Sequence, residues 1–391
     1  MKSEWKTSTI GAACSLVTDG SHSSPKSVES GEYMVSVKDF TEYGFDFTSC
    51  RRISSDDYET LKRNGCVPEQ GDILIGKDGA RYFEDIIIYR QPERPALLSS
   101  IAILRCNKEE IQPEFLYYTL RTPGFKQDVR DNYGSGSAIP RIILKDFKRM
   151  PISYPSLEVQ KQITAVLSIL DQRIQANTKI NDNLAELLQA VYQERFGDVS
   201  AATELGTLSD ICSYSRDRVA VSELNASTYF STENMLPGKA GATEAASLPT
   251  IPQTTACHKG DTLISNIRPY FKKIVYCEDR CGCSTDVLCF TPVQPKYAAY
   301  LFSTLYADKF FAFMVAGSKG TKMPRGDKQQ IMAYPAALPS DEELDEFNKL
   351  ALPILAQLHS NKAENKRLSA TRDALLPKLM SGEIDVSDIQ L

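Results

Sequence analysis

The sequence predicts two copies of a mixed α/β (α+β) globular domain, separated by two long helices that pack as an intramolecular antiparallel coiled coil. Three observations predict this fold class: an ordered internal repeat, two matching heptad patterns, and short β-prone runs within each repeat. The chain has 391 residues, of which 42% are hydrophobic and 24% charged. It is therefore long enough to bury more than one hydrophobic core.

The internal repeat relates the two halves of the chain in the same order. The run Gly-Asp-Ile-Leu-Ile at 71–75 returns as Gly-Asp-Thr-Leu-Ile at 260–264, and the loop at 134–141 returns at 317–325. Because a duplicated unit determines the whole fold, each half is expected to be one mixed globular region followed by one long helix.

Local patterns predict the elements of the globular regions. Runs of Ile, Val, Leu and Tyr predict strands at 85–89, 101–104 and 273–276, and turn residues interrupt these runs. Helical periodicity is present at 115–122 and 297–311. Each half is therefore expected to combine helices with a sheet.

A long helix with an apolar heptad seam follows each globular half. No proline interrupts 156–196, so the first helix is expected to be unbroken and about 60 Å long at 1.5 Å per residue. In the second helix, Pro353 and Pro377 predict a kink or an early stop. The expected seam positions are Gln160, Ile163, Leu167, Leu170, Ile174, Asn177, Asn181, Leu184, Leu188, Val191 and Arg195, and then Leu344, Phe347, Ala351, Ile354, Leu358, Asn361, Asn365, Leu368, Arg372, Leu375 and Leu379.

Both seams contain two asparagines near the middle. If the helices are antiparallel, Asn177 lies near Asn365 and Asn181 lies near Asn361. Such polar pairs lower stability but fix the helix register, because a shifted partner would leave buried amides unpaired. The alternative is that these asparagines cap a helix break or face solvent.

Composition limits the class of protein. The formal net charge is −5 at pH 7, which argues against a polycation. No run approaches the roughly 18 apolar residues of a membrane span, and residues 1–10 lack the apolar core of a signal peptide. We therefore expect a cytoplasmic protein without membrane association.

The ten cysteines are expected to be reduced, because they are spread along a chain without an export signal. The cluster from Cys277 to Cys289 lacks the paired spacing of structural zinc sites, so no metal site is predicted. Whether this cluster binds a metal stays open at the level of sequence.

No catalytic motif is present in the sequence. It has no P-loop, no HExxH zinc helix and no GxSxG nucleophile elbow. The Gly-Ser loop at 134–137 lacks the lysine that follows a P-loop, so we interpret it as a tight turn. Two functions stay open at this point. The chain could be a divergent metal-dependent DNA endonuclease that uses carboxylates at 72–77 and Asp261, or a coiled-coil scaffold that binds no DNA. Gly-Asp pairs also suit turns that lead into strands.

Three segments together resemble the specificity subunits of type I restriction-modification systems. The first is Val-Thr-Asp-Gly-Ser-His-Ser-Ser-Pro at 17–25, and the second is the Gly-Asp-Ile-Leu-Ile run with its Gly-Ser loop. The third is Pro-Ser-Leu-Glu-Val-Gln-Lys-Gln-Ile at 155–163, which opens the first long helix. The resemblance covers nearly the whole chain, although the second helix opens only loosely like the first, at 339–347.

The resemblance implies four segments. These are target recognition domain 1 at 1–155, a central conserved helix or spacer at 156–197, target recognition domain 2 at 198–338, and a C-terminal conserved helix and tail at 339–391.

The resemblance also implies a non-catalytic subunit that binds a bipartite, asymmetric target in double-stranded DNA. Each domain would read one half-site, while the helices set the gap and dock two DNA adenine methyltransferase subunits; restriction (translocase) subunits would join the complex. This chain would carry no cofactor, with S-adenosylmethionine in the methyltransferase and ATP and Mg in the motor-nuclease. The absence of NPPF-like or DPPY-like sequences agrees with this division of labour.

Candidate DNA-contacting residues are those whose side chains neutralise phosphates, read base edges or stack. The bases recognised and the gap length cannot be read from sequence. The candidates are His22, Lys38, Lys77, Arg81, Arg141, Lys145, Arg216, Arg268, Tyr270, Lys272, Lys273, Lys319, Lys322 and Arg325.

Overall fold

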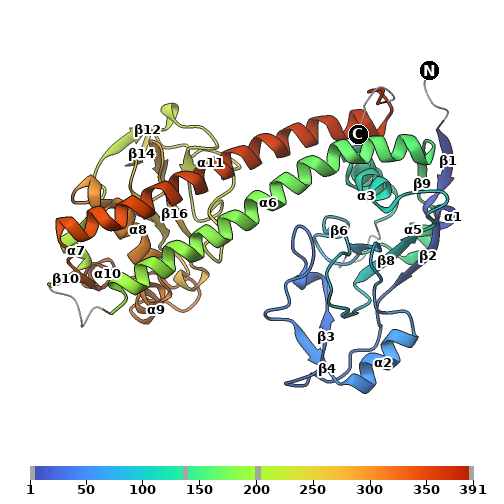
Figure 1. The fold of residues 1–391 in the computed structure, drawn as a ribbon, viewed down its shortest axis with the longest axis horizontal. Helices are drawn as coiled ribbons and strands as arrows, with labels where there is room; N and C mark the ends of the chain where they lie inside the picture. The colour runs from blue at the N-terminus through green and yellow to red at the C-terminus, as the bar shows by residue number, and fades with distance from the viewer. Residues whose placement is uncertain (1–4, 135–139, 199–203, 387–391) are drawn as a thin grey trace. The chain divides into compact units, whose positions relative to one another are not determined.

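The computed structural model describes residues 5–134, 140–198 and 204–386 (Figure 1). Contacts divide the chain into two compact units: unit 1 is Met1–Ile174 with Arg367–Leu391, and unit 2 is Gln175–Lys366. Both boundaries fall inside the long helices. Each unit therefore consists of one globular region and a part of both helices, while the four segments implied by the resemblance stay a prediction about function.

Unit 1 contains one four-stranded sheet, one three-stranded sheet and one strand pair. Its strands are β1 (Lys6–Thr9), β2 (Cys14–Asp19), β3 (Glu32–Val35), β4 (Arg51–Ile53), β5 (Ile73–Gly76), β6 (Ile86–Ile88), β7 (Ala96–Leu97), β8 (Ile101–Cys106) and β9 (Pro151–Tyr154). Its short helices are α1 (Ile10–Ala13), α2 (Ser55–Arg63), α3 (Pro113–Arg121), α4 (Pro123–Asn132) and α5 (Leu144–Arg149), with a 3-10 turn, η1, at Val37–Asp39. The sheet orders are β2-β8-β5-β6, β4-β3-β7 and β1-β9.

The central strand of unit 1, β5, is buried along its whole length because the sheet is covered on both faces. Side chains of a strand alternate between faces, and Ile73 and Ile75 accordingly enter one apolar cluster whereas Leu74 enters another. The first cluster also holds Phe115 and Leu116 of α3. This double burial explains why the strand is a continuous apolar run rather than an alternating one.

Unit 2 repeats this arrangement. Its strands are β10 (Leu205–Thr207), β11 (Cys212–Tyr214), β12 (Arg218–Ala220), β13 (Tyr229–Phe230), β14 (Gln253–Cys257), β15 (Thr262–Ser265), β16 (Ile274–Tyr276), β17 (Cys281–Cys283), β18 (Val287–Pro292) and β19 (Pro335–Ala337). Its helices are α7 (Leu208–Ile211), α8 (Ala298–Tyr306), α9 (Asp308–Ala316) and α10 (Lys328–Met332), with 3-10 turns η3 (Val221–Glu223), η4 (Pro269–Phe271) and η5 (Pro295–Tyr297). Its sheet orders are β11-β18-β15-β16, β12-β14-β17-β13 and β10-β19.

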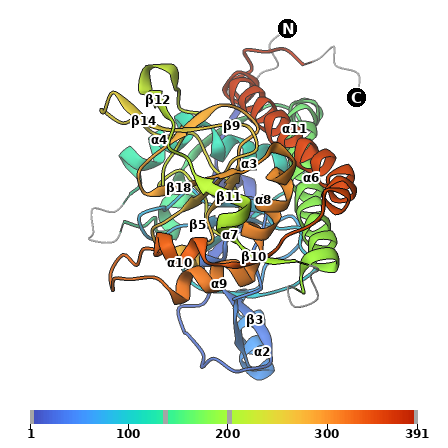
Figure 2. The same ribbon diagram turned by 90° about the vertical axis from the view of Figure 1, so that its left-hand side faces the viewer.

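The four-stranded sheets of the two units have the same strand order when repeat-related strands are matched: β11 corresponds to β2, β18 to β8, β15 to β5 and β16 to β6. All pairs within both sheets are antiparallel. Figure 2 turns the strands and helices of unit 2 toward the viewer, with β11 and β18 near α7 and α8. The sequence repeat is therefore a structural repeat.

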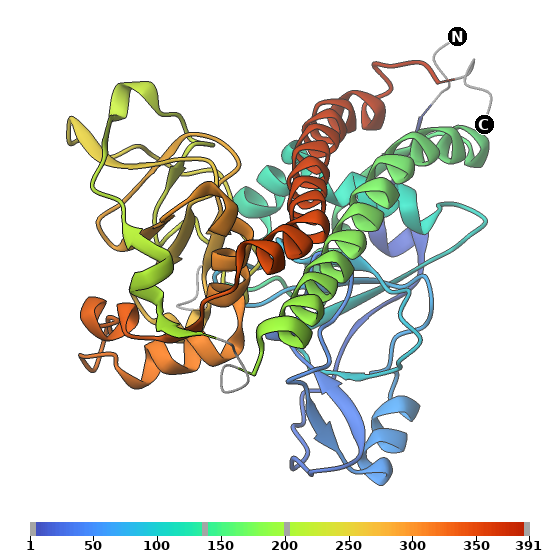
Figure 3. The same cartoon turned by 60° about the vertical axis from the view of Figure 1, so that its left-hand side comes forward.

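The two long helices are α6 (Leu157–Phe196) and α11 (Asp341–Met380). They lie side by side in Figures 1 and 3 and run antiparallel, because residues later in α6 contact residues earlier in α11. The expected early stop in α11 is wrong, since the helix continues through Pro353 and Pro377. An interior proline costs roughly 3 kcal/mol, and the burial of Phe347 and Leu355 on either side of Pro353 offsets that cost.

The buried stripe of each helix departs from the expected seam near the globular regions. Asp171 is buried where Leu170 was expected, and Phe196 is buried whereas Arg195 is exposed. A strict heptad drifts relative to the 3.6-residue turn of a straight helix, so the buried face moves by one position over the helix length. Within the part of the chain that the structure describes, none of the helices has both the length and the apolar composition that a bilayer crossing requires.

Candidate nucleic-acid interface

Each unit has the same pair of segments after its central strand, a tight turn and a loop bonded to it. In unit 1 the turn is 77–83 and the described part of the loop is 140–142; in unit 2 the turn is 266–272 and the loop is 317–326. We call these pairs turn–loop site 1 and turn–loop site 2. Residues 135–139, which include most of the Gly-Ser stretch interpreted as a tight turn, lie outside the described residues.

In turn–loop site 1, two backbone hydrogen bonds join the turn to the loop. The amide of Gly79 donates to the carbonyl of Pro140 at 2.9 Å, and the amide of Ile142 donates to the carbonyl of Lys77 at 3.0 Å. These bonds position the loop next to the end of β5.

Turn–loop site 2 has the equivalent pair of bonds. The amide of Arg268 donates to the carbonyl of Pro324 at 2.8 Å, and the amide of Gly326 donates to the carbonyl of Asn266 at 3.3 Å. The two sites therefore share one backbone frame, in which Arg268 takes the place of Gly79 and Asn266 takes the place of Lys77.

The charged side chains at the base of turn–loop site 1 neutralise one another. The Lys77 ammonium lies 3.4 Å from a carboxylate oxygen of Asp19 and 3.5 Å from one of Asp78. The His22 ring lies 3.4 Å from the same Asp19 oxygen, and its side chain is 76% exposed. Lys77 is only 6% exposed, so its charge stabilises the site internally, whereas His22 is accessible.

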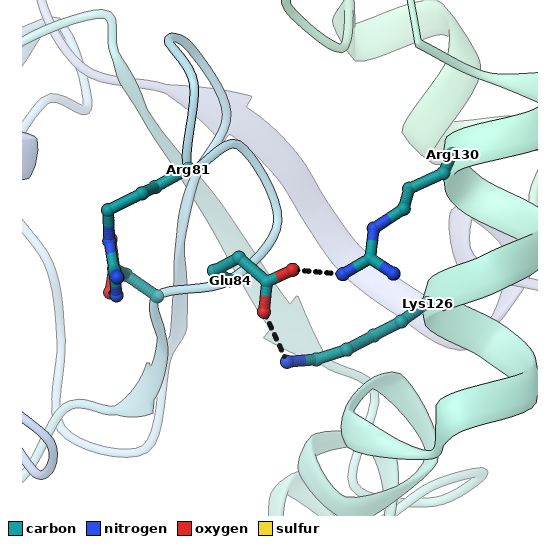
Figure 4. Close-up of polar contacts among 5 residues, drawn as sticks. Arg81, Glu84, Lys126 and Arg130 are labelled. Carbon is teal, nitrogen blue, oxygen red and sulfur yellow. Dashed lines mark hydrogen bonds and ion pairs between the residues drawn. The ribbon is translucent and has the colours of Figure 1, made fainter. Parts of the chain in front are cut away.

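Ion pairs fasten the turn of site 1 to α4 (Figure 4). Glu84 accepts hydrogen bonds from Lys126, at 2.8 Å, and from Arg130. Burial alone would raise the pKa of the Glu84 carboxyl, but these two cations lower it below its ordinary value. Arg81 pairs with Asp85 at 2.7 Å and remains exposed. The turn is thus held at its rear while Arg81 faces solvent.

In turn–loop site 2, five of the sequence candidates are brought together. An Arg268 guanidinium nitrogen lies 3.4 Å from the Lys322 carbonyl oxygen, and the backbone of Lys319 pairs with that of Arg325 in both directions at 2.9 Å. Tyr270 follows in the same turn and is 50% exposed. The result is a compact basic surface with an exposed aromatic ring.

Ion pairs also fasten the turn of site 2, but with the opposite polarity. Lys272 of the turn and Lys239 both pair with Asp308 at the start of α9, at 2.9 and 2.7 Å. These cations lower the pKa of the Asp308 carboxyl. In unit 1 the acid is Glu84, which directly follows the turn, and the helix supplies the bases. The two sites therefore reach the same anchoring with unrelated side chains.

Comparison with known proteins agrees with the duplicated architecture. Residues 2–186 match the family model of the type I restriction modification DNA specificity domain. The MjaIX specificity subunit of Methanocaldococcus jannaschii is 23% identical over 309 residues, covering 72% of this chain and 71% of the relative. The chain is thus similar to the type I restriction-modification specificity subunits, and it matches their family model over residues 2–186.

Two further proteins are similar to the chain. The HindI specificity subunit of Haemophilus influenzae is 26% identical to it over 137 residues, covering 33% of the chain and 28% of the relative. The crystal structure of a type I restriction-modification S subunit from M. genitalium has a TM-score of 0.51 and 18% identity, covering 97% of this chain and 96% of that one. The latter shows that the fold is shared.

Of the remaining DNA-contact candidates, Arg141 is exposed in the loop of turn–loop site 1 and forms a backbone bridge with Asp78. Lys273 donates to the Thr232 carbonyl at 2.6 Å. The others are exposed outside the two turn–loop sites, and they are Lys38 in η1, Lys145 in α5 and Arg216 between β11 and β12.

The nuclease alternative depends on Asp72 and Asp261. Both aspartates have structural roles in this chain. Asp72 accepts from the Glu69 amide and from Arg105, both at 2.8 Å. Asp261 accepts from the His258 amide at 2.8 Å, and burial raises the pKa of its carboxyl. Each is 1% exposed. Both residues cap the turn that leads into the central strand.

The cysteine cluster of unit 2 lies in an apolar environment, together with Met235, Leu263 and Val287. The Cys277 and Cys281 sulfurs are 3.6 Å apart. Across the described ranges, no group of three or more His, Cys, Asp or Glu side chains is placed to hold a metal ion.

The asparagines of the coiled coil contact each other across the helices in unit 2. Asn177 donates to the side-chain oxygen of Asn365 at 2.9 Å, and Asn361 donates to that of Asn181 at 2.9 Å. Asn177 is 1% exposed and also donates to a carboxylate oxygen of Glu364 at 2.8 Å, so loss of Asn365 would remove one of two acceptors of a buried amide.

We predict that Asn177 and Asn365 are energetically coupled. A double-mutant cycle with alanine at both positions is expected to give a coupling free energy of about 1 kcal/mol, measured by urea unfolding. A cycle on Asn177 and the exposed Lys179 serves as the control and is expected to be additive. Additivity at Asn177 and Asn365 would exclude a register role for this pair.

Proposed function

We propose that this specificity subunit binds a bipartite, asymmetric target in double-stranded DNA, one half-site through turn–loop site 1 and the other through turn–loop site 2. The supporting observation is that one backbone frame occurs twice with different side chains. The first turn exposes Arg81, whereas the equivalent position of the second turn exposes Tyr270, and Gly79 is replaced by Arg268. Because side chains read base edges, two frames with different exposed side chains predict two different half-sites.

The two long helices are proposed to set the length of the unread gap and to dock two DNA adenine methyltransferase subunits. The asparagine contacts between α6 and α11 support a fixed helix register. In this proposal, 1–155 and 198–338 are the target recognition domains, and 156–197 and 339–391 are the helical segments.

The chemistry is proposed to take place on partner chains. Methyltransferase subunits would carry S-adenosylmethionine, and restriction subunits would carry ATP and Mg, whereas the specificity subunit would recognise DNA without catalysing a reaction. The structural use of Asp72 and Asp261 as turn caps supports a non-catalytic chain.

The proposal is tested by mapping methylated adenines in a host that carries this chain and its partner methyltransferase. We expect every methylated site to contain two dissimilar half-sites separated by a fixed gap. A single continuous recognition sequence, or two identical half-sites, would contradict the proposal.

We predict that this chain binds DNA weakly by itself. Its net charge is −5, whereas DNA-binding domains usually carry a basic surplus. In gel shifts, the chain alone is expected to bind in the range of about 10⁻⁴–10⁻⁶ M, as in non-specific binding, with strong salt dependence. The complex with its methyltransferase is expected to bind at least about 100-fold more tightly, which is within the usual difference between specific and non-specific binding. Equal affinities would contradict this prediction.

A further inference from the structure

The turn of site 2 contains an arginine in a backbone conformation that favours glycine. Arg268 has φ +52°, in the left-handed region, and the equivalent residue of site 1 is Gly79, with φ +93°. A side chain makes this conformation unfavourable, because its Cβ approaches the backbone too closely. The second copy of the repeat therefore has an arginine at a left-handed position where the first copy has glycine, the residue that adopts this conformation most easily.

The fold itself gains little from the Arg268 side chain. Its guanidinium donates a long hydrogen bond, of 3.4 Å, to the Lys322 carbonyl. The Nε atom is buried without a hydrogen-bond partner in the described structure. Neighbouring cations differ in this respect: Lys319 pairs with Asp327 at 2.6 Å, and Arg325 pairs with Asp286 at 3.0 Å. Within the described ranges, no carboxylate forms an ion pair with the Arg268 guanidinium.

The turn that carries Arg268 is held firmly from behind. The amides of Gly238 and Lys239 donate to the carbonyls of Phe271 and Lys272 at 2.8 and 2.9 Å. Lys272 is then fixed by its ion pair with Asp308. A turn held at so many points can present a side chain in one direction, which is what recognition of a particular atom requires.

The outer side of the same turn is aromatic and accessible. Tyr270 and Phe271 are 50% and 38% exposed, and their ring centroids are 4.7 Å apart. Exposed aromatic side chains next to cations are typical of binding surfaces rather than of the rest of a protein surface. Arg268 therefore lies where a ligand would meet both charge and apolar contact.

We propose that Arg268 is a specificity-determining residue, which presents its guanidinium to a guanine of the second half-site in the major groove. This inference rests on the proposed function. The two parallel N–H donors of a guanidinium match the O6 and N7 acceptors of guanine. A guanidinium also binds phosphate, but a phosphate contact carries no sequence information and can be made from many directions. A rigid backbone in an unfavourable conformation is explained by the contact to guanine and not by a contact to phosphate.

The test compares Arg268→Gly and Arg268→Lys with the wild-type chain, each as the full chain with its partner methyltransferase. Arg268→Gly restores the residue of the first copy, so its melting temperature is expected to stay unchanged or to rise by up to about 4 °C. Methylome mapping is expected to show that one guanine position of the second half-site loses discrimination by about 10–100-fold. The first half-site and the gap are expected to stay unchanged. Arg268→Lys is expected to lose part of this discrimination, because an ammonium can donate to O6 and N7 but lacks the fixed plane of the guanidinium.

The control variant is Lys259→Ala, which removes a cation that is 76% exposed in the same unit, and it should leave both half-sites unchanged. Uniformly weaker methylation in Arg268→Gly that lysine restores would indicate a phosphate contact and overturn the inference. Unchanged half-sites in Arg268→Gly would also overturn it, while the bipartite target of the wild type would still support the proposed function. A wild-type target without two half-sites would overturn both.

Discussion

Replacing Arg372 with leucine is expected to destabilise unit 1 by about 3–5 kcal/mol, the range for removing one partner of a buried ion pair. Arg372 of α11 donates to Asp171 of α6 at 2.8 Å, and Tyr118 of α3 donates to the other Asp171 oxygen at 2.7 Å. Both members of the ion pair are buried, with Asp171 5% and Arg372 8% exposed. The leucine variant would leave the aspartate without a charge partner in the interior.

The charge of Arg372 is secure in the native protein. Burial alone would lower the pKa of its guanidinium, but the bonds to Asp171 and Asp373 raise it above its ordinary value. The destabilisation of Arg372→Leu is therefore expected across neutral and alkaline pH. Urea unfolding at pH 7 measures it, and Arg367→Leu, on the exposed face of the same helix, is the matched control with an expected change below about 0.5 kcal/mol.

The other half of the molecule indicates how the defect can be repaired. At the repeat-related positions of unit 2, Leu355 and Leu188 replace Asp171 and Arg372, and both are buried in one apolar cluster. The double variant Asp171→Leu with Arg372→Leu is thus expected to recover most of the lost stability, because apolar pairs often match buried ion pairs. A loss below about 1 kcal/mol in the single variant, or no recovery in the double one, would refute this account.

Lengthening both long helices by four residues is expected to change the gap between the half-sites and to leave their sequences unchanged. Four residues add about 6 Å to a helix, which corresponds to roughly one to two base pairs of DNA. The insertions belong between Asn177 and Asn181 in α6 and between Asn361 and Asn365 in α11, so that the helices stay matched. An insertion in α6 alone would shift one asparagine pair and is expected to lower stability as well.

Methylome mapping of the lengthened chain with its partner methyltransferase measures this effect. A chain with four residues added between Gly197 and Leu205, outside the helices, is the control and should keep the original gap. Altered half-site sequences with an unchanged gap would contradict the role assigned to the helices.

Much of the fold follows from patterns that persist along the sequence. The repeat at 71–75 and 260–264 predicts two equivalent central strands, and the strand orders of both sheets agree with it. The helical stretch expected at 297–311 is broken at Ala307 into α8 and α9. That break depends on one residue with an extended backbone, with ψ near 140°, and periodicity does not report a single dihedral angle.

The candidate site was less accessible to sequence reasoning. Asp171 was missed because it neighbours an apolar seam position, and its burial depends on the distant Arg372 and Tyr118. Lys77 stays a DNA-contact candidate, and nothing in its segment reveals that it is paired with the buried Asp19. The left-handed backbone conformation of Arg268 could have been suspected only by aligning Arg268 with Gly79. Gly79 follows the equivalent central strand in the first copy.

The core of unit 1 has a consequence for how the chain is made. It contains Leu376, Leu379 and Val386 together with apolar residues from β2, β5 and α3. A ribosome synthesises these strands first, and it synthesises Leu376, Leu379 and Val386 last. The whole of Gln175–Lys366 emerges in between. Unit 2 can therefore complete its interior while unit 1 still lacks part of its own, and the region translated first is the last to acquire its final packing.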